Sequence, residues 1–288
     1  MLYTMLFIIG LCFWSFGSVI TYRLKDFSLI DIRENKKSYR LAVTSILTGR
    51  SRCTSCHHTL QPTDLIPIVS YIIHKGQCQY CKKNISRLYP ILEIGSGIVF
   101  ALVWYLTLQA WLPRVEVILW IAISWLLYLL MIFDIQTWIL HETIWLKSLI
   151  TTGILLYLTP GFLRYYAVQR WVLFLLFFLA IYYLARMYVR FRWKKREDWF
   201  GIWDVRLSPI IWTLFGLIHT RYTHSPYFPD SLQLFQRYII STWLIWLAFY
   251  FLQKLYAPQN NSKEIPFFPG MVIWLWIIMV LGKYVLIN

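Results

Sequence analysis

Charged side chains are scarce in this chain, making up only 14% of its 288 residues. A soluble globular domain typically has about 25% charged residues. The apolar residues, 59% of the chain, gather in separate blocks that are close to the roughly 20 residues a helix needs to cross a bilayer. The strict alternation of a membrane β-barrel is absent from the sequence. Because backbone polar groups cannot stay unpaired in lipid, the blocks predict membrane helices.

Acidic residues are scarcer still: 13 Asp and Glu stand against 28 Lys and Arg, giving a formal charge of +15. Such an excess raises the question of nucleic-acid binding. The basic residues, however, cluster in loops beside the apolar blocks, as the positive-inside rule describes. We therefore expect anionic membrane lipids, and no nucleic acid, among the partners.

The N-terminus lacks the short apolar core and small-residue cleavage site of a removable signal, so residues 2–22 are read as a retained membrane helix. The sequence predicts an all-α polytopic membrane protein of about eight spans. Pro209, near the start of the sixth span, suits the beginning of a helix. The predicted spans are residues 2–22, 91–111, 115–133, 141–159, 169–190, 205–219, 234–256 and 266–287.

Loop charges predict how the chain is oriented. Residues 23–90 carry twelve Lys or Arg and residues 186–207 carry seven. An even number of spans separates these two segments, so both are assigned to the cytoplasmic side. The predicted division is a first membrane helix at 1–22, a cytoplasmic loop at 23–90, and a multi-helix membrane domain at 91–288.

Two cysteine pairs lie in that long polar loop, as Cys53-Thr-Ser-Cys56 and Cys78-Gln-Tyr-Cys81, with 21 residues between the pairs. Four thiolates arranged two and two can form a tetrahedral shell around one zinc ion. The alternatives are disulfides, which a reducing cytoplasm disfavours, and four free thiols in a loop. Cys12, inside the first apolar block, is assigned to packing.

Two aspartates border predicted spans and carry the candidate chemistry. Asp134 ends the third span and Asp204 precedes the sixth, so both are expected at the cytoplasmic face. Two carboxylates in a poorly hydrated site share a proton, so one can take a proton from water while the other polarises a carbonyl. Alternatively each is a solvated helix-end charge, with Asp204 capping a helix. Their spacing of 70 residues does not show whether they meet.

Other acidic residues near the spans allow different readings. Glu93 can pair with a basic neighbour of a membrane helix, such as Arg87. A proton-relaying transporter is a further alternative, because acidic residues within membrane segments are often functional. The position of Asp134 and Asp204 at span ends, instead of mid-span, argues against that alternative.

Four segments of the first hundred residues carry a recognisable pattern. They are Arg52-Cys-Thr-Ser-Cys56, Asp64-Leu-Ile-Pro67-Ile-Val-Ser70-Tyr71, Gly76-Gln-Cys78-Gln-Tyr-Cys81 and Ile85-Ser-Arg-Leu-Tyr89-Pro90-Ile-Leu-Glu93. In order and spacing, over about 45 residues, they resemble the cytoplasmic loop of the type IV prepilin peptidases.

The resemblance implies a membrane aspartic endopeptidase of the bacterial cytoplasmic membrane. Members of that family cleave the leaders of prepilins and pseudopilins at the cytoplasmic face, and many also methylate the new N-terminus with S-adenosylmethionine. By motif, Asp134 matches the first catalytic aspartate and Asp204 the second. The implied partners are prepilin or pseudopilin helices and lipids, and the implied cofactors are zinc and S-adenosylmethionine.

Two departures from the family pattern bear on catalysis. The second aspartate motif of the family is Gly-x-Gly-Asp, whereas this chain has Gly201-Ile-Trp203-Asp204. The usual Leu-Pro-Asp after the first aspartate is Leu140-His141-Glu142. A non-catalytic assembly factor for pilin-like proteins is therefore the alternative function. The sequence shows no glycine-rich nucleotide loop that would place S-adenosylmethionine.

Overall fold

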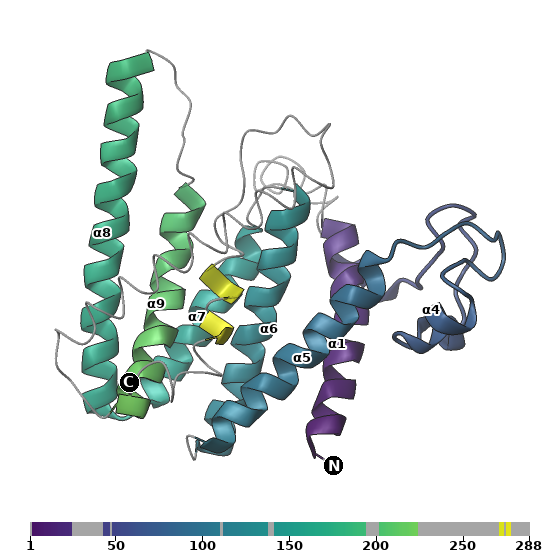
Figure 1. Ribbon diagram of the computed structural model, residues 1–288, viewed down its shortest axis with the longest axis horizontal. Helices are drawn as coiled ribbons and strands as arrows, with labels where there is room; N and C mark the ends of the chain where they lie inside the picture. Colours follow the sequence, from purple (N-terminus) through teal and green to yellow (C-terminus); the bar gives the residue numbers. More distant parts are fainter. Residues whose placement is uncertain are drawn as a thin grey trace. The chain divides into compact units, whose positions relative to one another are not determined.

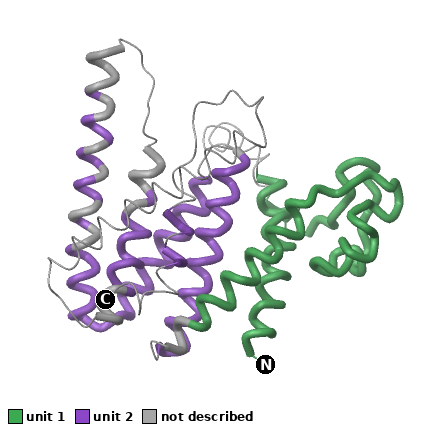
Figure 2. The backbone as a smooth tube through the Cα atoms, in the orientation of Figure 1, with its two compact units in different colours: residues 1–105 green, residues 106–288 purple. Residues whose placement is uncertain are grey.

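The computed structural model describes residues 2–24, 43–46, 48–109, 112–137, 141–193, 202–223, 271–273 and 275–277. Within these ranges the chain is mostly helical and has no β-strand, only two isolated β-bridges. It divides into two compact units, Met1–Tyr105 and Leu106–Asn288 (Figure 2). The helical part of the predicted fold class is therefore confirmed for the described residues.

Two long apolar helices form the framework of the first unit, α1 (Leu2–Leu24) and α5 (Leu88–Gln109). They approach closely because glycines lie at the crossing. A Cβ on Gly10 would come within 2.7 Å of the Ser96 carbonyl oxygen, and one on Gly97 within 2.8 Å of the Phe7 ring. Small residues allow such close backbone approach between membrane helices. The two helices thereby form a rigid base.

The segment of the chain that connects α1 to α5 forms a small module that contains the four cysteines. Figure 1 shows this module around α4. Its regular elements are the 3₁₀ helix η1 (Pro62–Leu65) and the single-turn helix α4 (Val69–Ile73). At the end of α1, the guanidinium of Arg23 donates to the carbonyls of Gly49 and Arg50, at 3.2 and 3.4 Å. This contact ties the start of the module to the end of α1.

The second unit contains four consecutive helices. They are α6 (Arg114–Thr137), α7 (Glu142–Leu158), α8 (Gly161–Trp193) and α9 (Ile202–Thr223). Short connections turn the chain back on itself, so successive helices alternate in direction. Helix α6 packs against α7, and α9 packs against both α7 and α8.

The first six predicted spans each coincide with one of these helices. Among the residues that the structure describes, three helical stretches are long and apolar enough to cross a membrane: Leu2–Leu24, Leu88–Tyr105 and Arg114–Gln136. The seventh predicted span lies outside the described residues, and the eighth is described only at 271–273 and 275–277, which are helical. The number of eight spans therefore stays a prediction.

The starts of α8 and α9 differ from those predicted. Helix α8 begins at Gly161 and not near 169, because only Thr159 and Pro160 separate it from α7. The side chain of Arg164 donates to the carbonyls of Tyr157 and Thr159 at the end of α7 and so caps that helix. A cation at this position also complements the helix dipole.

Helix α9 also begins earlier than predicted, at Ile202, so Pro209 lies inside the helix and not at its start. A proline at an interior position cannot donate a hydrogen bond to the preceding turn. The hydroxyl of Thr213 donates to the Pro209 carbonyl at 2.8 Å, which satisfies a polar group of the buried turn.

Candidate functional site

The first cysteine pair forms a tight turn that is defined by backbone hydrogen bonds. The amide of Cys53 donates to the carbonyl of His58, and the amide of His57 donates to the carbonyl of Cys53, both at 3.0 Å. His57, directly after Cys56, has a φ of 56°. This left-handed residue closes the turn, so that both thiols face the same side.

The second pair repeats this turn. The amide of Cys78 donates to the carbonyl of Lys83, and the amide of Lys82 donates to the carbonyl of Cys78, both at 2.9 Å. Lys82, directly after Cys81, has a φ of 57°. Both backbone hydrogen bonds of the first turn therefore recur in the second.

The correspondence extends beyond the turns themselves. Each turn is flanked by one isolated antiparallel bridge, Arg52 to Thr59 in the first and Gln77 to Asn84 in the second. Cys53 and Cys78 are equivalent, a shift of 25 positions that also relates the two bridges. The module is thus a duplicated cysteine turn. We did not recognise this repeat from the sequence, because beyond the cysteines the equivalent residues differ.

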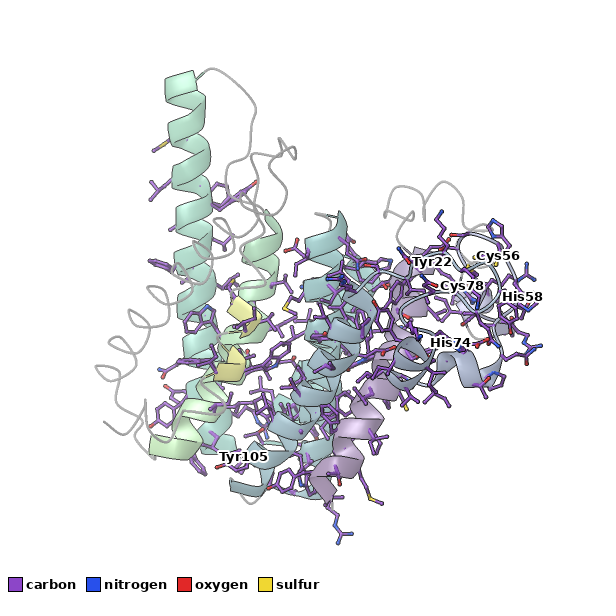
Figure 3. All side chains as sticks on the ribbon, turned by 45° about the vertical axis from the view of Figure 1, so that its right-hand side comes forward. Tyr22, Cys56, His58, His74, Cys78 and Tyr105 are labelled. Carbon is purple, nitrogen blue, oxygen red and sulfur yellow. The ribbon has the colours of Figure 1, made fainter. Side chains whose placement is uncertain are left out.

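The four sulfur atoms meet at one point. The Sγ atoms of Cys53, Cys56, Cys78 and Cys81 all lie within 4.8 Å of one another, and that of Cys53 lies 3.9 Å from that of Cys81. A tetrahedral zinc ion with Zn–S bonds of about 2.3 Å places its sulfurs about 3.8 Å apart. The four cysteines are therefore positioned to bind a metal ion such as zinc. Figure 3 shows Cys56 and Cys78 within the module.

The electrostatics of the thiols favour a cation between them. Backbone N–H groups of Cys56 and Ser55 lower the pKa of Cys53 to about 6, because they stabilise its thiolate. The N–H of His58 acts in the same direction on Cys56, but desolvation and the sulfurs of Cys53 and Cys81 outweigh it and raise the pKa of Cys56 to about 11. Without a metal, the four sulfurs cannot all ionise cheaply. A metal cation removes that repulsion.

A polar network around Asp64 fixes the second cysteine turn. The carboxylate oxygen Oδ2 of Asp64 accepts from the Gln61 amide at 2.9 Å and from the Tyr80 hydroxyl at 3.2 Å. His74 Nε2 lies 3.4 Å from Oδ1 of Asp64. The ring of His58, from the first turn, stacks on Tyr80 with centroids 3.7 Å apart. The network therefore connects both cysteine turns to η1 and to the end of α4.

Glu93 fastens the module to α5. Its Oε2 accepts a hydrogen bond from the backbone amide of Ile68 at 2.7 Å. Ile68 has a φ of 62° and directly precedes α4; this conformation is rare for a β-branched residue. The suggestion that Glu93 pairs with a basic side chain such as Arg87 is therefore wrong, because a backbone amide takes that place. Sequence alone could not show this partner, which depends on the path of the loop.

Asp134 lies in the last turn of α6, which ends at Thr137. Its Oδ2 is buried and has no hydrogen-bond partner within the described part of the chain. A buried carboxylate oxygen without a partner is costly to maintain and is common at functional sites. Asp134 is therefore a candidate for chemistry.

Asp204 lies in the first turn of α9, and its side chain falls outside the described atoms. Because α6 to α9 alternate in direction, the end of α6 and the beginning of α9 lie at the same end of the second unit (Figure 1). The fold thus brings the two aspartate-bearing helix ends to one end of the second unit. An acidic residue in a first turn also complements the helix dipole.

The backbone of Trp203, the residue that departs from the family motif, is helical. Trp203 is the second residue of α9. A helical residue has negative φ, so this position does not need the conformational freedom of glycine. The backbone therefore accommodates Trp203 without strain.

His141 is a polar residue near Asp134 to which the sequence reasoning assigned no role. It is buried before α7, its Nδ1 lies 2.8 Å from the Thr143 hydroxyl, and its ring contacts Phe133 with centroids 5.2 Å apart. Its Nε2 is buried with no partner among the described residues. The sequence signal that could have indicated His141 as a candidate is its place at the border of an apolar block.

The cysteine module and the two helices that flank it match a known protein family profile. A profile for the Bacterial Peptidase A24 N-terminal domain matches residues 8–107. The chain is similar to curated proteins named prepilin leader peptidase/N-methyltransferase. It is 26% identical over 217 residues to the "Prepilin leader peptidase/N-methyltransferase" of Vibrio cholerae, covering 75% of this chain and 78% of that protein.

Two other relatives of the same name match shorter stretches. That of Pseudomonas putida is 28% identical over 156 residues, which is 51% of this chain and 51% of the relative. That of Bacillus subtilis is 44% identical over 57 residues, 20% of this chain and 23% of the relative. The chain thus spans about half or less of the length of these two curated relatives. No solved structure matches the chain.

Proposed function

We propose that this protein is a membrane aspartic endopeptidase that cleaves the leaders of prepilin- or pseudopilin-like substrates. The observation that carries the proposal is the pair of aspartate-bearing helix ends on one side of the second unit, in a chain related to prepilin leader peptidases. The buried Asp134 oxygen supports it. The comparisons do not favour the alternative of a non-catalytic assembly factor.

In the proposed mechanism, Asp134 and Asp204 share one proton. The ionised carboxylate takes a proton from water, whose oxygen attacks the scissile carbonyl, while the protonated carboxyl donates to the carbonyl oxygen. The tetrahedral intermediate then collapses. A proton passes to the leaving nitrogen as the carbon–nitrogen bond breaks. The substrate helix would approach from the bilayer.

The proposed metal is zinc in a structural role, held by Cys53, Cys56, Cys78 and Cys81. Four protein ligands leave no open position for substrate, which is the arrangement of structural zinc sites. The metal would stabilise a module too small to have its own apolar core. The domain division at residues 22 and 90 also stays part of the proposal.

The proposed location is the bacterial cytoplasmic membrane, with the cysteine module and the aspartates on the cytoplasmic side. The loop charges support this orientation. N-methylation of the new N-terminus with S-adenosylmethionine is a proposed second activity, supported by the names of the relatives. Transfer of labelled methyl groups to the cleaved substrate would test it.

The test of the proposed function is leader cleavage of a co-expressed prepilin in membranes, compared among the wild type, Asp134→Ala and Asp204→Ala. General acid–base groups contribute about 10²–10⁴-fold, so we expect each variant to lose cleavage by that order. Asp198→Ala, an acidic change outside the proposed pair, serves as the control and should cleave like the wild type. Equal cleavage by Asp204→Ala would remove Asp204 from the mechanism.

A further inference from the structure

The cysteine module carries an exposed apolar surface on its η1–α4 segment. Residues 65–73 read Leu-Ile-Pro-Ile-Val-Ser-Tyr-Ile-Ile and contain no charged side chain. Contiguous exposed apolar patches on proteins usually mark contact with a partner or a membrane. The large exposed side chains, here called the apolar patch, are Leu65 (37%), Ile66 (46%), Val69 (48%), Ile72 (68%) and Ile73 (67%).

The rotation of α4 explains why this surface points away from the module. Val69, Ile72 and Ile73 have the spacing that places side chains on one face of a helix. Tyr71 instead faces the second cysteine turn. Its hydroxyl lies 3.5 Å from the Ile85 carbonyl, and a Cβ on Gly76 would meet that hydroxyl at 2.9 Å. Because Tyr71 packs inward, the three aliphatic side chains stay outward.

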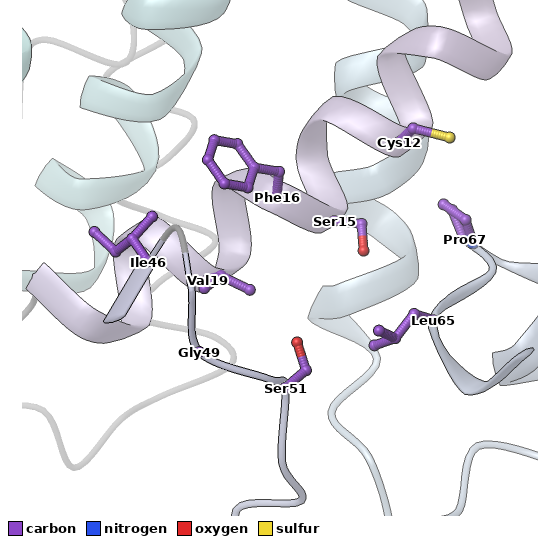
Figure 4. A pocket seen from close by; sticks show the side chains of 9 residues that line it. All are labelled: Cys12, Ser15, Phe16, Val19, Ile46, Gly49, Ser51, Leu65 and Pro67. Atoms are coloured by element: carbon purple, nitrogen blue, oxygen red, sulfur yellow. The ribbon is translucent and has the colours of Figure 1, made fainter. Parts of the chain in front are cut away.

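The apolar patch lies beside the membrane helices of the same unit. Leu65 and Pro67 line one cavity of about 330 Å³ together with Cys12 and Ser15 of α1 (Figure 4). Leu24, the end of α1, follows Cys12 by 12 residues, which is about 18 Å of helix. With a hydrocarbon core of about 30 Å, Cys12 lies at hydrocarbon depth. The η1–α4 segment therefore reaches below the end of α1.

The contact with α5 supports the same depth. Glu93, which binds the Ile68 amide, follows the first residue of α5, Leu88, by five positions. That offset is about 7 to 8 Å along the helix axis. The contacts with α1 and with α5 thus agree. Each places the start of α4 beside the apolar part of a membrane helix and not beyond the end of that helix.

The exposed charges of the module favour a lipid surface as the occupant of the apolar patch. Residues 48–90 contain one acidic residue, Asp64, against six basic ones. Anionic headgroups attract such residues near a membrane surface. A second copy of this chain, with its formal charge of +15, would be repelled. The basic residues are Arg50, Arg52, Lys75, Lys82, Lys83 and Arg87.

We infer that the apolar patch of the η1–α4 segment is embedded among lipid acyl chains of the leaflet on the module side, with exposed basic residues of the module close to anionic headgroups. The module is thus an interfacial membrane element and not a loop in water. The lipid contact and the Glu93–Ile68 hydrogen bond together hold the metal module against the bilayer. This inference rests on the membrane helices and does not depend on the proposed peptidase activity.

The test places a benzophenone amino acid at Ile72 in the full-length, zinc-loaded protein, reconstituted in bilayer discs of phosphatidylcholine and phosphatidylglycerol. Thr54, an exposed residue between two cysteines, carries the same probe in the matched control. After illumination, mass spectrometry measures covalent phospholipid adducts on each peptide. We expect at least about fivefold more adduct at Ile72 than at Thr54, and less with phosphatidylcholine alone.

Bound zinc is measured for each probe protein, so that only folded modules are compared. If the probe at Ile72 prevents zinc binding, Ile73 on the same face of α4 takes its place, with the same expectation. Equal lipid labelling at the two positions would overturn the inference. Crosslinking of the Ile72 probe to a second copy, or to a pilin-like helix in place of lipid, would also overturn it.

Discussion

The cysteine module and the aspartate-bearing helices position their functional groups in opposite ways. The four cysteines fall within residues 53–81, and backbone turns place their sulfurs within 4.8 Å of one another. Two helices, α7 and α8, separate Asp134 from Asp204 along the chain, and the positions of the two aspartates depend on helix lengths and on the turns between helices. One site is local in sequence, whereas the other depends on the packing of a membrane bundle.

The comparison indicates that the two regions respond differently to substitution. In the module, local backbone hydrogen bonds and the proposed metal ion set the geometry, so single changes act within one small unit. In the bundle, buried apolar packing around α6 and α9 holds the helices whether or not a carboxylate is present. Damage to the module should therefore leave the helices of the second unit folded.

The largest expected effect comes from removing a metal ligand. Cys78 is buried, with 5% of its surface exposed, and we expect Cys78→Ser to abolish stoichiometric zinc binding and unfold the module. Structural zinc in small domains contributes about 10–16 kcal/mol of apparent binding free energy. Metal content and hydrogen exchange of residues 51–85 measure the effect.

Cys12→Ser is the matched control, because Cys12 lies in α1 outside the ligand set. Metal content should stay that of the wild type. The protection of α6 from hydrogen exchange should persist in both Cys78→Ser and Cys12→Ser. If Cys78→Ser removed protection from α6 as well, the two regions would be coupled and the comparison would not hold.

An intermediate effect is expected at the link between the module and α5. Glu93→Ala removes the acceptor of the Ile68 amide and leaves a part-buried donor unsatisfied, which costs about 1–3 kcal/mol. Glu93→Gln keeps an acceptor oxygen and should retain most of the stability. Hydrogen exchange at Ile68 and the thermal midpoint of the module report the difference. An equal loss of module stability in Glu93→Ala and Glu93→Gln would show that the charge of Glu93, and not its hydrogen bond, matters at this position.

The smallest expected effect is at Tyr80. Tyr80→Phe removes the hydroxyl that donates to Asp64 at 3.2 Å but keeps the ring that stacks on His58. A hydrogen bond of this kind contributes about 0.5–1.5 kcal/mol. We expect a small decrease in module stability with zinc content unchanged. Tyr22→Phe, at a mostly exposed position of α1, is the control, and zinc loss by Tyr80→Phe would contradict the expectation.

Particular residues show where sequence reasoning succeeded and where it did not. The cysteine spacing predicted a metal-binding cluster, and the apolar blocks predicted helices, because both depend on short-range patterns. The start of α8 was missed because residues 161–168 are less apolar than the block that follows them, although Arg164 caps the end of α7. The partner of Glu93 was missed because Ile68 lies 25 residues away along an irregular loop.

The sequence by itself determined the elements and the chemistry that they carry: apolar helices of membrane length, two cysteine pairs, and two aspartates at helix ends. Side-chain type and local spacing encode these features directly. Only the tertiary structure decided the duplicated turn geometry of the cysteines, the anchoring of the module by Glu93, and the position of the η1–α4 segment beside α1 and α5. These depend on backbone dihedrals and on contacts between segments far apart in the chain, which no local pattern specifies.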